Sequence, residues 1–137
     1  MSPPVVTPLA CPHNLLGAGA VWHASAGRLL WVDRAANSVH GYEPATGRTL
    51  TALVGESVGT VVPTRRGEVL VALQRRFAFL DLVHARLTPF PVEPLLPATH
   101  RFNDGQCDVT GRLWVGSMDL AAEPGAGGSI SKAPGSR

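Results

Sequence analysis

The sequence has few cysteines, few charges and no long apolar run. Its two cysteines, Cys11 and Cys107, can form neither a disulfide framework nor a CxxC metal pair, and each is interpreted as a small buried thiol. Charged residues make up only 16% of the chain and the net charge is +2. Because a nucleic-acid-binding surface needs a dense basic stripe, no nucleic-acid partner is expected.

Targeting and membrane signals are also missing. The start, residues 1–4, has neither the positive nor the apolar region of a signal peptide. The longest nearly apolar run, residues 15–22, is far shorter than the roughly 18 residues that a membrane span needs. No segment repeats apolar residues at helical spacing between caps. We therefore expect a cytoplasmic protein with few helices and no membrane contact.

What the chain does contain is a repeated pattern. A polar turn ending in glycine, a charged residue and a short apolar strand occur three times, with the turn glycines at Gly27, Gly67 and Gly111. These glycines are 40 and 44 residues apart. Repeats of this length are typical of β-propellers, in which each repeat is one four-stranded antiparallel sheet, called a blade. The sequence therefore predicts an all-β propeller.

Further strands are expected around each turn. A hairpin signal covers residues 44–48, where turn-forming residues cluster. The expected strands before the turns are 19–22, 60–62 and 105–107; those after the shared segment are 38–42, 77–80 and 128–131; a fourth strand follows at 49–53.

The repeat length places about three blades in one partial domain, residues 1–137. The expected blades are 17–57, 58–100 and 101–137, with a surface loop at 120–128. Closed propellers contain roughly four to eight blades, and the third copy reaches its end where a fourth strand is due. We therefore expect a truncated, incomplete propeller whose open blade edges favour a homo-oligomer.

One run carries a family resemblance. Arg101-Phe102-Asn103-Asp104-Gly105 is followed by Asp108, Gly111-Arg112 and Gly116-Ser117-Met118, and weaker likenesses lie at 17–22, 30–33 and 42–47. Together they resemble the opening of the senescence-marker-protein, regucalcin and gluconolactonase family over about residues 15–118. The resemblance implies a six-bladed propeller that hydrolyses sugar lactones.

The resemblance also implies site residues. It implies a divalent metal, calcium or zinc, which would activate a water molecule, and it assigns substrate contacts to Arg101, Asn103 and Asp104. The family's first metal ligand is a glutamate, and Ala18 stands at the matching position, so no metal ligand is predicted here. We expect an impaired metal-dependent lactonase that binds metal weakly or not at all. The alternative is a non-catalytic propeller fragment that acts as a binding or self-associating module.

Structural interpretations of the same residues remain open. Residues 101–105 could form a tight turn between blades, with Gly105 in the left-handed region. The five histidines are expected on loops or strand surfaces, and the three tryptophans are expected to pack between blades. Three aspartates are interpreted as turn caps rather than ligands, namely Asp33, Asp81 and Asp108.

Overall fold

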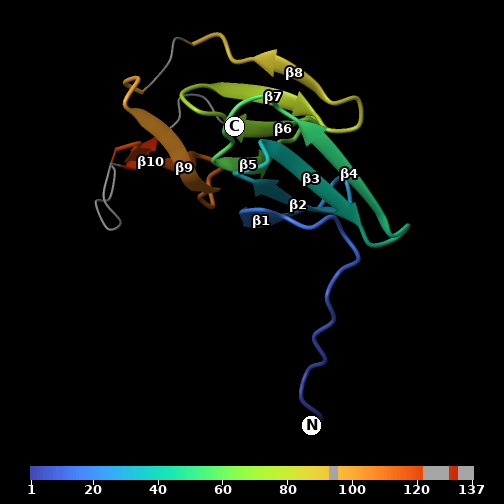
Figure 1. Ribbon diagram of the computed structural model, residues 1–137. Helices are drawn as coiled ribbons and strands as arrows, with labels where there is room; N and C mark the ends of the chain where they lie inside the picture. Colours follow the sequence, from blue (N-terminus) through green and yellow to red (C-terminus); the bar gives the residue numbers. More distant parts are fainter. Residues whose placement is uncertain (93–95, 122–129, 133–137) are drawn as a thin grey trace.

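The computed structural model describes residues 1–92, 96–121 and 130–132, and every regular element within these ranges is a β-strand (Figure 1). The prediction of an all-β chain is therefore confirmed. No helix in this part of the chain is long and apolar enough to cross a membrane. The strands are β1 (Gly17–His23), β2 (Arg28–Asp33), β3 (Ser38–Glu43), β4 (Arg48–Leu53), β5 (Thr60–Pro63), β6 (Val69–Ala72), β7 (Phe77–Asp81), β8 (Arg86–Pro89), β9 (His100–Cys107), β10 (Leu113–Asp119) and β11 (Ile130–Lys132).

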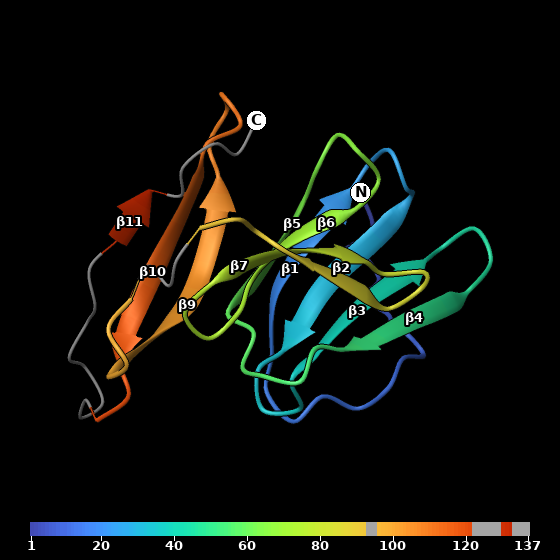
Figure 2. The same cartoon turned by 90° about the horizontal axis from the view of Figure 1, so that it is seen from above.

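Strands that follow one another in the chain pair in antiparallel fashion. They form two four-stranded sheets, β1-β2-β3-β4 and β5-β6-β7-β8, and a sheet of β9, β10 and β11 in which β10 is central. Seen from above, the sheet of β9, β10 and β11 lies to one side of the other two sheets (Figure 2). The first strands of the sheets, β1, β5 and β9, contact one another. Such an arrangement of successive meanders around their first strands is that of propeller blades.

The middle sheet is buried on both faces. Successive side chains of a strand point to opposite faces of the sheet, so alternate residues of β6 enter different cores. Val69 and Val71 belong to a core shared with β2 and β3, whereas Leu70 and Ala72 belong to a second core that includes Phe102 of β9. Two separate cores therefore hold the middle sheet against its two neighbours, and both fix the position of β5 between β1 and β9.

The innermost strands approach each other through glycine. A Cβ at Gly59, just before β5, would lie 2.4 Å from the carbonyl oxygen of Asn103 and 2.7 Å from that of Phe102. A Cβ at Gly105 would lie 2.8 Å from the carbonyl oxygen of Trp114. Thr60 Oγ1 also donates a hydrogen bond to the Gly105 carbonyl over 3.2 Å. Any larger residue at position 59 would push β9 away from the centre.

The turn predictions agree with the structure. Gly27, Gly67 and Gly111 have φ values of +62°, +86° and +82°, the left-handed region that tight turns use. Asp33, Asp81 and Asp108 cap turns as expected, since each carboxylate accepts hydrogen bonds from backbone amides two or more residues further along the chain. Burial raises the pKa of Asp33. Hydrogen bonds from four backbone amides, those of Leu15, Ala36, Leu16 and Ala35, lower it by more, so the pKa lies below its ordinary value.

Two expectations about strands are wrong or incomplete. Strand β8 was not predicted, because it has only four residues, is largely exposed and ends in proline. Strand β9 begins at His100 rather than near residue 105, so the turn interpretation of residues 101–105 is wrong, and Gly105 is not in the left-handed region. The expected loop at 120–128 falls mostly outside the described residues, as does the end of the third repeat at 133–137.

Several side-chain expectations are also wrong. His23 and His40 are buried rather than on the surface. Ser25 hydrogen-bonds His23, and Ser38 and Thr51 hydrogen-bond the two ring nitrogens of His40. Cys107 is exposed rather than buried. Of the tryptophans, Trp31 is buried but stacks on His40 of its own sheet, whereas Trp22 is 51% and Trp114 42% exposed.

The close approach at Gly59 predicts a clear stability difference. We expect Gly59→Ala to lower the free energy of unfolding by about 1–3 kcal/mol, because backbone atoms of β9 would have to move away. Gly116→Ala is the matched control, since its Cβ would meet only the Asp104 carbonyl at an ordinary 3.6 Å. Urea unfolding of both variants measures the difference. Equal stability of the two would contradict the close packing of β5 on β9.

The buried histidines predict a loss of stability in acid. Burial lowers the pKa of His40 more than the charge of Asp33 raises it, and burial likewise lowers the pKa of His23. The unfolded chain therefore takes up protons first, and stability falls as the pH drops through the ordinary histidine pKa of 6.5. Each proton adds at most about 1.4 kcal/mol per pH unit to the slope.

The measurement is the free energy of unfolding between about pH 7.5 and about pH 5.5. His40→Gln is expected to flatten this slope, whatever it does to the stability at neutral pH, while substitution of the exposed His13 by Gln leaves the slope as it is. A slope in His40→Gln equal to that of the unmodified chain would show that His40 is not held neutral by burial.

Candidate functional site

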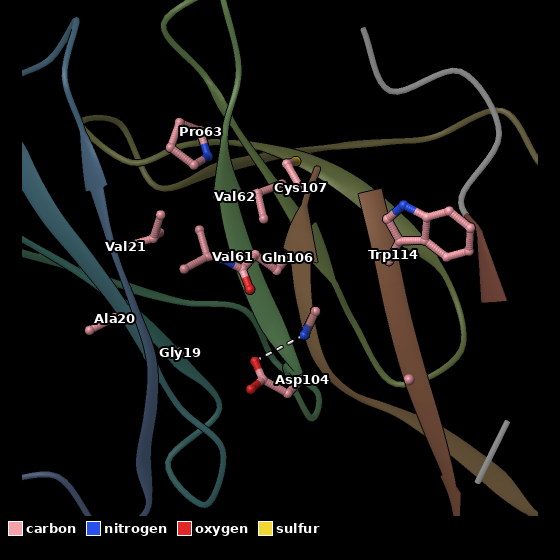
Figure 3. Close-up of a pocket in the computed structure, with 12 residues that line it drawn as sticks. Gly19, Ala20, Val21, Val61, Val62, Pro63, Asp104, Gln106, Cys107 and Trp114 are labelled. Atoms are coloured by element: carbon pink, nitrogen blue, oxygen red, sulfur yellow. Dashed lines mark hydrogen bonds between the residues drawn. The ribbon is translucent and has the colours of Figure 1, made fainter. Parts of the chain in front are cut away.

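A cavity of about 710 Å³ lies along the inner strands (Figure 3). Strand β1 contributes Gly19, Ala20 and Val21 on one side, and β5 and β9 contribute the other (Figure 3). Most of the wall is apolar, while Asp104 and Gln106 of β9 bring polar groups to it. The remaining lining residues are Val61, Val62, Pro63, Gly105, Cys107, Trp114 and Gly116.

Strand β9 carries the three residues predicted to contact substrate. Phe102 is buried and stacks on Phe77 with ring centroids 4.8 Å apart, which anchors the strand to the middle sheet. Asp104 lines the cavity, and its side chain is 69% exposed. Its Oδ1 accepts a hydrogen bond of 2.9 Å from the Gly105 amide. Arg101 and Asn103 precede it on the strand but do not line this cavity, so the structure brings only Asp104 to its wall.

Asn103 has a buried acceptor that lacks a partner. Its Oδ1 is inaccessible to solvent and forms no hydrogen bond with the described part of the chain. An unsatisfied buried polar group costs about 1–3 kcal/mol, and such groups are rare in folded proteins. Asn103 thus leaves one hydrogen-bond acceptor unsatisfied among the described residues.

Arg34 is a residue that sequence reasoning missed. It follows β2, and its Nε and Nη2 donate to the Gly59 carbonyl over 3.2 and 3.1 Å. Its Nη2 also lies 3.8 Å from Asp104 Oδ1, and its side chain is only 16% exposed. No motif or repeat marked this position, since the side chain reaches β9 from a different sheet. The only sequence signal was its place directly after Asp33, at the end of a buried strand.

Arg34 and Arg101 interact electrostatically. Burial lowers the pKa of Arg101, and the positive charge of Arg34 lowers it further. Arg101 Nη1 donates to the Phe102 carbonyl over 3.4 Å. The candidate site is therefore a cluster of Arg34, Arg101, Asn103 and Asp104, held by two sheets at the edge of the inner strands.

The residues of this cluster do not fit a divalent metal. The described part of the chain contains no group of three or more His, Cys, Asp or Glu side chains able to hold an ion. Ala18 offers only a methyl group, and it lines a separate hollow of about 290 Å³ together with Leu9, Cys11 and Trp31. Calcium needs six to eight oxygen ligands and zinc four ligands in all. The residues of this cluster therefore supply neither set of ligands.

Comparison with known proteins gives a consistent assignment. Residues 16–136 match the family model described as the SMP-30/gluconolactonase/LRE-like region. The chain is 33% identical over 111 residues to a regucalcin from Danio rerio, which covers 81% of this chain and 37% of that protein. It is 37% identical over 125 residues to an L-arabinolactonase from Azospirillum brasilense, which covers 86% of this chain and 39% of that protein.

A solved structure extends the comparison to the fold. The crystal structure of a calcium-binding regucalcin from Agrobacterium tumefaciens superposes with a TM-score of 0.71 and 27% identity, over 87% of this chain and 43% of that one. The fold is thus a β-propeller of the six-bladed type, present in part. The chain spans less than two fifths of the length of the relatives that it matches. Because the family model covers most of the chain and both relatives exceed 30% identity, the chain belongs to the SMP-30/gluconolactonase/LRE-like family.

Proposed function

We propose that this chain binds a sugar lactone through Arg101, Asn103 and Asp104 and takes part in its hydrolysis. The observation that carries the proposal is the unpartnered, buried Oδ1 of Asn103 between two charged residues of β9. The family assignment supports it, since one relative is named an L-arabinolactonase. The substrate of the proposal is therefore the cyclic ester of a sugar acid.

The chemistry of the reaction suits these side chains. In lactone hydrolysis water adds to the ester carbonyl, the ring C–O bond breaks, and the product is an open-chain sugar acid. The Arg101 guanidinium has donors for the oxygens on which negative charge develops. Asn103 Oδ1 accepts a hydrogen bond from a sugar hydroxyl, and the exposed Asp104 carboxylate accepts another. These residues orient the substrate and stabilise charge.

The proposal includes weak binding of a divalent ion, calcium or zinc. One relative of known structure is named a calcium-binding protein, and in this chain Ala18 stands where the resemblance implies an acidic ligand. Loss of one carboxylate removes both a ligand and a charge, so we propose that this chain binds such ions weakly.

Hydrolysis of D-gluconolactone and L-arabinonolactone tests the function. We expect the whole chain, with calcium or zinc added, to hydrolyse at least one lactone faster than a protein-free blank. Asn103→Ala is expected to lower kcat/KM by about tenfold or more, because the hydrogen bond to the sugar hydroxyl is lost. Arg48→Ala, at the exposed start of β4 and far from the cluster in sequence, serves as the control. Rates equal to the blank with both metals present would refute the lactonase function.

Restoring a carboxylate at position 18 tests the weakened metal site. We expect Ala18→Glu to bind calcium or zinc at least about tenfold more tightly than the unmodified chain, measured by isothermal titration calorimetry. Ala20→Glu adds the same charge two residues further along β1 and is the matched control. If both variants gain the same affinity, the gain reflects added charge alone and position 18 has no special role.

A binding or self-associating module is the second candidate. The observation that favours it is the exposure of two large aromatic side chains, Trp22 on the inner strand β1 and Trp114 on β10. Large exposed aromatic groups are typical of surfaces that contact another protein. The lactone assay, combined with light scattering, separates the candidates, because an inactive chain that forms stable dimers supports the second and an active monomer supports the first.

A further inference from the structure

Arg34 and Arg101 bring two positive charges to the same place from different sheets. The Arg34 guanidinium is fixed on the Gly59 carbonyl, and that of Arg101 reaches the Phe102 carbonyl. These two anchor points are in close contact, since a Cβ at Gly59 would lie 2.7 Å from the Phe102 carbonyl oxygen. The backbone packing of β5 on β9 therefore holds the two guanidinium groups near each other.

The positive charge of the pair is not balanced within the described residues. Asp104 is the only carboxylate recorded as an ion partner of the two arginines there; it lies 3.8 Å from Arg34, and its side chain is mostly exposed. The bonds of Arg34 to Gly59 are to a neutral carbonyl. Partly buried cations are unfavourable unless an anion or several hydrogen bonds compensate them. Two guanidinium groups and one carboxylate leave an excess of one positive charge.

We infer that Arg34 and Arg101 together bind an acidic group of a sugar ligand, with Asn103 accepting a hydrogen bond from a neighbouring hydroxyl. Guanidinium groups match carboxylate, sulfonate and phosphate oxygens with two parallel hydrogen bonds. This inference rests on the proposed function, because it assigns the anion to the same cluster. The acidic group has two possible sources, the carboxylate that ring opening creates or an acid that the lactone already carries.

Three open-chain ligands of similar size test the inference. Sorbitol is neutral, D-gluconate carries one carboxylate and D-glucarate carries two. Binding to the whole chain is measured by calorimetry after metal ions have been removed with a chelator and gel filtration, so that carboxylates cannot bind through a metal. We expect D-gluconate to bind at least about tenfold more tightly than sorbitol, and the difference to shrink as salt is added.

Variants identify the residues responsible. Arg34→Gln is expected to reduce the preference for D-gluconate to less than about threefold, while Arg34→Lys keeps part of it. Arg48→Gln removes the same charge from the exposed start of β4 and keeps the full preference. Arg101→Gln provides a second route to the same loss should Arg34→Gln fail to fold, which a thermal melt would reveal. Equal binding of sorbitol and D-gluconate, or an undiminished preference in Arg34→Gln, overturns the inference.

The remaining outcomes assign the source and separate the two proposals. Tighter binding of D-glucarate than of D-gluconate supports a lactone that carries its own acid, and equal binding supports the product carboxylate. An intact preference in a chain that hydrolyses no lactone means that the proposed function fails while the anion site stands. If the chain hydrolyses a lactone but binds D-gluconate no more tightly than sorbitol, the proposed function stands and the anion site fails.

Discussion

The structure depends on the burial of the middle sheet on both faces. Neighbouring residues of β6 enter different cores, Val71 with the first sheet and Leu70 with the third. Because a strand presents alternate residues to opposite sides, one run of apolar side chains holds three sheets together. This packing sets the spacing of the inner strands, and at Gly59 and Gly105 it leaves no room for a side chain.

The candidate site is a consequence of that packing rather than of any one segment. Phe102 is drawn into the second core, which fixes β9 and with it the residues on either side. The Gly59 carbonyl, held against β9, then provides the acceptor that fixes Arg34 from the first sheet. Loosening the contact between β5 and β9 would therefore separate the two arginines before it unfolded any sheet, since each sheet keeps its own hydrogen bonds.

Sequence reasoning reached the parts of this arrangement that local chemistry determines. Turn glycines at blade-length intervals and apolar runs such as 69–73 were enough to predict the strands of the first two sheets, except β8. The family resemblance pointed to Arg101, Asn103 and Asp104, whose roles stay a prediction. What could not be predicted depends on side-chain contacts between strands: Arg34 reaches Gly59 from another sheet, and His40 is buried between Ser38 and Thr51 of its own sheet. Contacts between side chains on different strands cannot be read from the spacing of residues along the sequence.

The same charge distribution accounts for two features that the family resemblance alone leaves separate. The cluster of Arg34, Arg101, Asn103 and Asp104 has two guanidinium groups and one carboxylate, and Ala18, which lines a separate hollow, offers only a methyl group. Two unit charges about 4 Å apart interact by about 4 kcal/mol at an effective dielectric constant of about 20, and a divalent ion doubles that repulsion. A site of this composition disfavours a divalent cation for the same reason that it favours an anion. The poor fit to a metal and the excess positive charge are therefore one property of the cluster, and Arg34 contributes to both.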